Sequence, residues 1–359
     1  MQIAVIEGDD AAPEAMRPSL EILERLNRHY ALGIDWVYPP IGAPAEQEFG
    51  SPFPMEAQQI IDAASTTYFG STSGNASRAL FYLRWGKETY ANVRPCRYFM
   101  GMSSPLSDPT GIDFVVVREN LEDLYLGIEG DLDELRGLNF PQRTRRGALS
   151  EIGEGRYAVK AITRHGTERV VRFAFELAQK RAQAAGRVPH VTCTAKYNML
   201  ARSDGYFVDI ARDLAAEYPD VELDTFIIDD FACRIIAQPK ALDVVVMPNL
   251  YGDIMSDAAA GLIGGLGLAA SGCYGRDYAY FESAHGTAPD IAGQNIINPT
   301  ATLLSGVMML NYLGFVRAGE SLERAIEATY ADGHALTPDQ GGTASTTDFC
   351  ASVSDHLGV

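Results

Sequence analysis

The chain has 359 residues, a hydrophobic fraction of 47% and a formal net charge of -18. This length accommodates two domains or one large α/β unit, and the composition is ordinary for a globular protein with a large core. The negative charge argues against non-specific nucleic-acid binding, because a phosphate backbone would be repelled. An anionic substrate would therefore have to be held by a local cluster of arginines.

The cysteines and the apolar runs limit the class of protein further. The five cysteines form no C-x-x-C pair, so neither a zinc site nor a disulfide framework is expected, and buried reduced thiols of a cytoplasmic protein are the simplest account. The first residues read as a short strand and lack the features of a signal peptide. No apolar run is long enough to span a bilayer.

Short apolar runs alternate with helical patterns along the chain, which predicts an α/β protein with a largely parallel sheet. The expected elements are, in order, a strand at residues 3–6, a helix beginning at Pro13, a strand at 66–69, a helix at 80–85, an extended segment at 90–95 stopped by proline, a strand at 113–117, a helix capped by Thr167, a strand at 190–193, a helix at 207–214, and strands at 221–228 and 244–246 followed by an alanine-rich helix.

Two segments do not fit this alternation. Residues 130–155 lose periodicity and collect charge, including Arg143, Arg145 and Arg146; they read either as a mobile surface loop or as an arm exchanged between subunits. Gly265–Ala270 mimics a dinucleotide fingerprint, but it follows a helix and lacks the strand-borne acid, so we do not interpret it as a Rossmann loop.

Two carboxylates follow the last predicted strand. Asp253 and Asp257 are four residues apart, which on a helix places them on one face, one turn apart. Such a pair of hard oxygen ligands suits Mg²⁺ or Mn²⁺. Taken alone, the pair is better explained as two solvated acids near a helix N-terminus.

Basic side chains at the ends of predicted elements strengthen the metal interpretation. Arg84, Arg94 and Arg118 together suit a substrate with two carboxylates, because guanidinium groups bind carboxylates with two parallel hydrogen bonds. Lys196 follows a strand, and a desolvated lysine beside a metal can lose its proton and act as a base. Asp229, at another strand exit, is either a third acidic ligand or a helix cap.

Six motifs resemble, in order and spacing, those of the β-decarboxylating dehydrogenases, a family that includes isopropylmalate, isocitrate, homoisocitrate and tartrate/D-malate dehydrogenases. They are Ile6–Glu14, Tyr90–Pro95, Val117–Asn120, Met247–Asp257, Ala284–Gly293 and Asn298–Thr302.

The resemblance implies an isopropylmalate-dehydrogenase-like two-domain α/β fold with a large mixed, mostly parallel sheet that is not a Rossmann fold. It also implies a cleft between the domains and a homodimer that shares its active sites. We expect residues 1–98 and 258–359 to form a cofactor-binding domain, and residues 99–257 a central domain with the dimer interface and an arm near 130–155.

The resemblance also suggests a role for each site residue. Arg84, Arg94 and Arg118 resemble the clamp on the malate moiety, Tyr125 the acid that protonates the enol, and Lys196 the base, supplied by the partner subunit. The metal ligands would be Asp229 from the partner with Asp253 and Asp257. The expected cofactor set is His285, Gly286, Ala288, Asp290, Ile291, Asn298 and Asn198.

The implied reaction is metal-dependent oxidation of a 2-hydroxy acid followed by loss of the β-carboxylate as CO₂. Asp290 would accept hydrogen bonds from the adenosine ribose and repel a 2′-phosphate, so we expect NAD. The NADP-dependent members of the family usually carry lysine and tyrosine where this chain has Asp290 and Ile291.

The chain departs from the family pattern in two places. In the first loop, Asp10, Ala11 and Ala12 interrupt the usual Gly-Asp-Gly-Ile-Gly-Pro-Glu, so the loop is either stiffer, with altered cofactor contact, or simply tolerant of the change. In the segment that reads the malate substituent, Leu80 and Phe81 favour an apolar group.

These departures leave the substrate open. Arg78, a turn before Leu80, could reach an anionic substituent. We expect an isopropylmalate-like or other specialised 3-substituted (R)-malate; the alternatives are a tartrate or D-malate dehydrogenase and an isocitrate or homoisocitrate type. A catalytically silent regulatory relative is least favoured, since the tyrosine, the lysine and all three aspartates are present.

Overall fold

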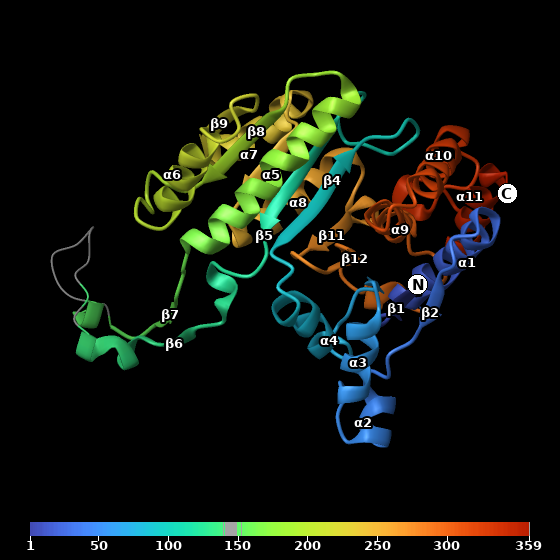
Figure 1. Ribbon diagram of the computed structural model, residues 1–359, viewed down its shortest axis with the longest axis horizontal. Helices are drawn as coiled ribbons and strands as arrows, with labels where there is room; N and C mark the ends of the chain where they lie inside the picture. Colours follow the sequence, from blue (N-terminus) through green and yellow to red (C-terminus); the bar gives the residue numbers. More distant parts are fainter. Residues whose placement is uncertain (139, 141–148, 152, 359) are drawn as a thin grey trace.

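The computed structural model describes residues 1–138, 140, 149–151 and 153–358, and Figure 1 shows a central sheet covered by helices. The strands of this sheet are β1 (Gln2–Ile6), β2 (Asp35–Val37), β3 (Thr66–Phe69), β4 (Ala91–Arg97), β5 (Asp113–Glu119), β8 (His190–Ala195), β9 (Glu222–Ile227), β10 (Val244–Met247), β11 (Ala270–Tyr274) and β12 (Ala279–Ser283).

The ten strands lie in the order β2-β1-β3-β12-β11-β4-β5-β10-β8-β9. Neighbouring strands are parallel except where β4 pairs with β5 and β11, and where β11 pairs with β12. The predicted mixed, mostly parallel α/β sheet is thereby confirmed.

The helices pack on both sides of the sheet. They are α1 (Ala12–Tyr30), α2 (Ala43–Phe49), α3 (Met55–Ala63), α4 (Ser77–Phe81), α5 (Arg164–Ala185), α6 (Asp204–Ala215), α7 (Ile228–Ala237), α8 (Asn249–Ile263), α9 (Thr300–Tyr312), α10 (Val316–Asp332) and α11 (Thr346–Leu357). In Figure 1, α9, α10 and α11 lie beside α1, so the two ends of the chain share one region. Within the described part of the chain, no helix is both long and apolar enough to cross a membrane.

Strand β10 shows how the sequence places the site. All four of its residues are buried, because a central strand covered on both faces favours a continuous apolar run. Its last residues pair in register with β5, Val246 with Val117 and Met247 with Arg118. Helix α8 begins two residues later and therefore starts beside Arg118.

Several predicted boundaries differ from the structure, and two of the differences have a clear physical reason. Helix α5 begins at Arg164, and its cap is Thr163, whose side chain accepts a hydrogen bond from Gly166 N. Thr167 lies inside the helix and is buried. Strand β4 continues through Pro95. Proline has no backbone N–H, but β11 pairs with β4 only as far as Val93. The proline therefore removes no hydrogen bond on the side of β4 that faces β11.

The charged segment near 130–155 begins and ends as a pair of strands. β6 (Glu129–Asp131) and β7 (Arg156–Ala158) pair antiparallel and extend away from the main sheet in Figure 1. This shape favours the arm interpretation. Its exchange between subunits stays a prediction, and Arg143, Arg145 and Arg146 lie outside the described residues.

The proposed division into residues 1–98 plus 258–359 and residues 99–257 also stays a prediction, and its last boundary falls within α8. The thiols follow expectation except at one position: all five cysteines are free and four are buried, but Cys233 is exposed. It lies on the face of α7 opposite the buried Phe231 and Ile235, because two residues turn a helix by more than half a circle.

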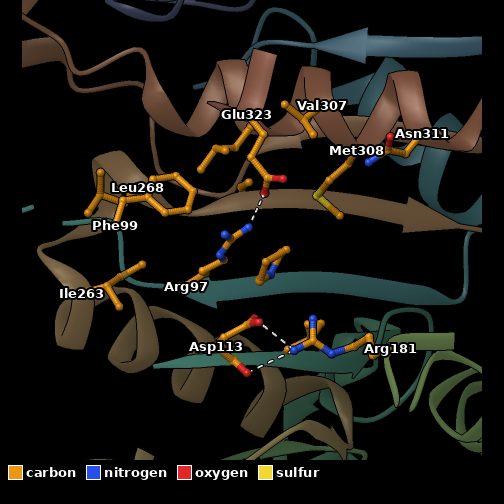
Figure 2. A pocket seen from close by; sticks show the side chains of 14 residues that line it. Arg97, Phe99, Asp113, Arg181, Ile263, Leu268, Val307, Met308, Asn311 and Glu323 are labelled. Carbon is orange, nitrogen blue, oxygen red and sulfur yellow. Dashed lines mark hydrogen bonds and ion pairs between the residues drawn. The ribbon is translucent and has the colours of Figure 1, made fainter. Parts of the chain in front are cut away.

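A hollow of about 200 Å³ separates β4 and β5 from α9 and α10. Its charged residues are already paired, Arg97 with Glu323 at 2.9 Å and Arg181 with Asp113 at 3.0 Å, as Figure 2 shows. The remaining lining is largely apolar. None of the predicted site residues lines this hollow, so the candidate site lies elsewhere.

Candidate active site

The three predicted arginines meet at one cavity of about 180 Å³, which Tyr125 and Asp253 also line. Arg84 comes from the π-helical turn Tyr82–Gly86 that follows α4, while β4 and β5 supply Arg94 and Arg118. Residues from three separate elements therefore form a single basic wall, as the sequence predicted.

Arg118 is the most buried of the three, with 1% of its surface exposed. Its Nε donates to Asn249 Oδ1 at 2.8 Å, and its Nη1 pairs with Asp253. Its guanidinium carbon lies 4.9 Å from the centre of the Tyr125 ring. Burial, followed by the nearby Arg94 charge, lowers the pKa of Arg118 to about 10, so the group remains cationic at neutral pH.

Arg94 joins the basic wall to α8. Its Nη1 donates to Ser256 Oγ at 2.7 Å and to Asp257 Oδ1 at 3.1 Å, and lies 3.4 Å from Asp253 Oδ1. One guanidinium therefore touches both carboxylates, which confirms that they share a helix face. The Nε atoms of Arg94 and Arg84 are buried and have no hydrogen-bond partner within the described residues. The side chains of both arginines line the cavity, where their guanidinium groups are placed to bind a ligand's carboxylate.

The two carboxylates of α8 differ in electrostatics. Burial would raise the pKa of Asp253, but Arg118, the hydrogen bond from Tyr125 and Arg94 outweigh it and hold this pKa below its usual value. Burial raises the pKa of Asp257, with Arg94 opposing. Burial also raises the pKa of Tyr125, and its bond to Asp253 acts in the same direction. The phenol is therefore protonated at neutral pH.

The aspartate pair fits a divalent cation in part. Asp253 and Asp257 provide hard oxygen donors one helical turn apart, which suits Mg²⁺ or Mn²⁺. No three acidic, histidine or cysteine side chains converge in the portion of the chain that the structure describes. The described part of one chain therefore supplies these two carboxylates and no third side-chain ligand of these types beside them.

Lys196 and Asp229 do not reach this cavity within one chain. They form an ion pair with each other, and their side chains are 30% and 66% exposed. The bond from Lys196 lowers the pKa of Asp229. Asn198, in the same loop as the lysine, is exposed. The structure therefore separates the predicted residues into the cavity set and this exposed set.

The predicted cofactor segment follows β12. His285 and Gly286 line the cavity, and burial lowers the pKa of His285. Asp290 is exposed in the 3₁₀ turn Pro289–Ile291, next to Ala288 in a left-handed conformation. Asn298 is buried, and its amide donates to Asp339 Oδ2 at 2.9 Å.

The altered first loop is tied to this segment. Asp10 has φ 53°, a left-handed conformation that aspartate tolerates better than most residues. Asp9 accepts hydrogen bonds from Thr72 Oγ1 at 2.6 Å and from Ser73 N at 2.9 Å. The N–H of Ala11 donates to Thr287 O at 3.0 Å. The loop is thus held on two sides, consistent with the stiffer-loop expectation.

Of the three residues expected to read the substituent, only Leu80 lines the cavity. Phe81 is 55% exposed and packs edge-on against Trp85, with ring centres 5.3 Å apart. Arg78 is exposed and is not among the lining residues.

Sequence reasoning missed Glu282, which lines the cavity from β12. Burial raises the pKa of this carboxyl, with Arg84 and Arg94 opposing. The available signal was the short apolar run at residues 279–281, shortly before the Ala284–Gly293 motif. This run forms most of the buried strand β12.

Comparison with known proteins agrees with this geometry. The family model described as isocitrate/isopropylmalate dehydrogenase matches residues 2–355. A "3-isopropylmalate/3-methylmalate dehydrogenase" of Methanocaldococcus jannaschii is 38% identical over 99% of this chain and 98% of its own length. An "isocitrate dehydrogenase [NADP]" of Thermus thermophilus is 37% identical over 99% of this chain and 68% of its own.

A solved structure gives the same result. The crystal structure of isocitrate dehydrogenase from Methylococcus capsulatus superposes with a TM-score of 0.82 at 34% identity and covers 99% of both chains. The fold and the arginine–aspartate cavity thus define a hydroxyacid dehydrogenase that also decarboxylates. The chain belongs to the isocitrate/isopropylmalate dehydrogenase family.

Proposed function

We propose that the protein catalyses the metal-dependent, NAD-linked oxidative decarboxylation of a 3-substituted (R)-malate with an apolar substituent, giving a 2-oxo acid and CO₂. The observation that carries this proposal is the convergence of Arg84, Arg94 and Arg118 on one cavity beside the carboxylates of α8. Charged forks of this kind bind carboxylates strongly when desolvated.

Each residue then has a distinct task. The three arginines hold the two carboxylates of the malate, and Asp253 and Asp257, with Asp229 of the other subunit, would hold the cation. When bound, the cation would supply a Lewis acid for the substrate oxygen, and the nicotinamide would supply the hydride acceptor. Lys196 from the other subunit accepts the hydroxyl proton at Nζ, and Tyr125 Oη donates a proton to C3 after CO₂ has left.

The charge of the cavity supports an apolar substituent. The positive charges of the three arginines are balanced by the carboxylates of Asp253, Asp257 and Glu282. A dianionic malate that binds together with a divalent cation adds no net charge to the cavity. A third carboxylate would need another cation, yet Arg78 is exposed and outside the lining. Leu80 offers an apolar contact instead.

The choice of NAD rests on Asp290. Its carboxylate is exposed in the turn after the cavity-lining His285 and Gly286, where it would repel a 2′-phosphate. Relatives are named for both cofactors, such as the NADP enzyme of Thermus thermophilus and a probable NAD enzyme subunit of Drosophila melanogaster. Membership of the family therefore does not decide between NAD and NADP, and the proposal of NAD depends on Asp290.

A homodimer would bring the exposed set to the cavity. Apolar side chains are exposed on the segments involved: Met199 in the Lys196 loop is 59% exposed, Ile236 on α7 59% and Ile254 on α8 58%. Exposed large apolar side chains of this kind are compatible with a protein interface. A second copy that covers α7 and α8 would also deliver its Lys196 and Asp229. A cytoplasmic location stays a prediction, supported by the free cysteines.

A substrate panel tests the function. NADH formation is measured with Mn²⁺ for isopropylmalate, ethylmalate, isocitrate, homoisocitrate, tartrate and D-malate, with NAD and then NADP. We expect the highest kcat/KM for an alkyl-substituted malate. A preference for isocitrate would refute the apolar substituent, and a preference for tartrate or D-malate would favour a small polar pocket. No turnover with any acid, despite saturable NAD binding, would indicate a silent relative.

A further inference from the structure

Two fully buried carboxylates share one lysine at the base of the arm. Asp123 and Asp204 have no exposed surface. Lys160, two residues after β7, places its Nζ 2.7 Å from Asp204 Oδ1 and 3.2 Å from Asp123 Oδ1. Apart from these ion pairs, neither Oδ1 atom has a hydrogen-bond partner within the described residues. The Lys160 ammonium is therefore the cation that the two carboxylates share.

The other oxygen of each carboxylate holds a backbone segment of the candidate site. Asp204 Oδ2 accepts hydrogen bonds from the Lys196 N–H at 2.8 Å and from the Tyr251 hydroxyl at 2.9 Å. Asp123 Oδ2 accepts from the N–H of Leu250 at 3.0 Å. Leu250 lies in the first turn of α8. The pair thus contacts the loop of the proposed base and the start of the metal-binding helix.

Asp123 also holds an uncommon backbone conformation. Its φ is 69° and its ψ is -141°, a region that residues other than glycine rarely adopt. Its N–H donates to Ala161 O at 3.0 Å, and the turn Leu124–Leu126, which carries Tyr125, follows directly. Such strain persists only where the surroundings fix the residue, and Lys160 and Leu250 do so here.

We propose that Lys160 is a positioning residue that, through Asp123 and Asp204, fixes the Lys196 loop, the first turn of α8 and the Tyr125 turn relative to one another. The inference rests on the proposed function. If Lys196 serves the partner's site while Tyr125 serves its own, each Lys160 connects the two active sites of a dimer. Misplacement of a catalytic group by about 1 Å lowers turnover roughly a hundredfold.

Replacement of the lysine tests this role in the full-length protein. In Lys160→Met, we expect kcat to fall by about 10²-fold, with KM for the acid and Kd for NAD changed by less than about threefold. Lys160→Arg keeps the charge and should recover most of the loss. The matched control is Lys240→Met, which removes an exposed lysine paired with Asp108 at 2.6 Å and should leave kcat unchanged.

Asp123→Gly separates positioning from folding. Glycine adopts the observed conformation without strain, so we expect a melting temperature near that of the wild type together with a kcat reduced by about tenfold or more. Full activity in well-folded Lys160→Met and Asp123→Gly would overturn the proposal.

Amide hydrogen exchange gives a readout that does not depend on activity. In Lys160→Met, the N–H groups of Lys196 and Leu250 should exchange faster, while Lys240→Met leaves them protected. Unchanged protection would overturn the positioning role even if no substrate were found. If the wild type turns over no acid and Lys160→Met still loses protection, the proposed function is refuted while the positioning of these backbone segments remains supported.

Discussion

Helix α8 contains two glycines for which the same substitution should have opposite effects. A Cβ added to Gly252 would lie 2.5 Å from Cγ and 2.6 Å from Cβ of Arg118, with its Cα at 3.1 Å. These atoms belong to the base of a buried side chain and cannot swing aside. A Cβ on Gly261 meets nothing within 4 Å. Gly252→Ala therefore perturbs Arg118, and Gly261→Ala is its control.

Two free-energy contributions of opposite sign act in Gly252→Ala, and only the favourable one acts in Gly261→Ala. Alanine is favoured over glycine in a helix interior by about 1 kcal/mol, while forcing a methyl group into a packed core costs about 1–3 kcal/mol. We expect Gly252→Ala to lower the free energy of unfolding by about 1 kcal/mol and Gly261→Ala to raise it by about 0.5–1 kcal/mol. Displacement of the guanidinium should also raise KM for the acid about tenfold or more in Gly252→Ala alone, since the lost hydrogen bonds are charged.

Urea titration of both variants and the wild type measures the first effect, and steady-state kinetics with the best acid of the panel measures the second. The helix gives both substitutions the same intrinsic preference, so the difference between them reports the contact with Arg118. The reasoning is refuted if Gly252→Ala is stabilised as much as Gly261→Ala, or if it keeps the wild-type KM.

Three further outcomes follow from the site. Tyr125→Phe or Lys196→Ala should lower kcat by about 10²–10⁴-fold while NAD still binds, as fluorescence titration will show; near-normal turnover would remove their assigned roles. EDTA should abolish turnover and Mg²⁺ or Mn²⁺ restore it, whereas activity that survives chelation would argue against a cation at Asp253. The ratio of kcat/KM for NAD over NADP should exceed one and should fall in Asp290→Ala, because the repulsion of the 2′-phosphate is removed; a wild-type preference for NADP contradicts this.

The parts of the site that lie within one helix or at one strand end were predictable. The spacing of Asp253 and Asp257 fixes their common face once a helix forms, and the apolar run of β10 indicates where that helix begins. Arg118 could be placed for the same reason, because it lies at the C-terminal end of β5, next to the last residue of a strand that is clear in the sequence.

Contacts between distant segments were not predictable. Lys160 meets Asp123 and Asp204 only after the arm returns to the sheet, and no periodicity marks this return. Glu282 lies on β12, whose apolar run at residues 279–281 was present in the sequence but was not interpreted as a strand. The cap of α5 was misplaced because Thr163 and Thr167 are four residues apart and both suit the start of a helix.

The exposed ion pair between Lys196 and Asp229 has a consequence for mixtures of inactive proteins. If the base always crosses to the other subunit, a Lys196→Ala chain still offers an intact Tyr125, and a Tyr125→Phe chain still offers an intact lysine. Random pairing of equal amounts makes half of the dimers mixed, and each mixed dimer assembles one competent site, so about a quarter of wild-type activity should return. Two variants that are each inactive alone would thus regain activity when they are mixed.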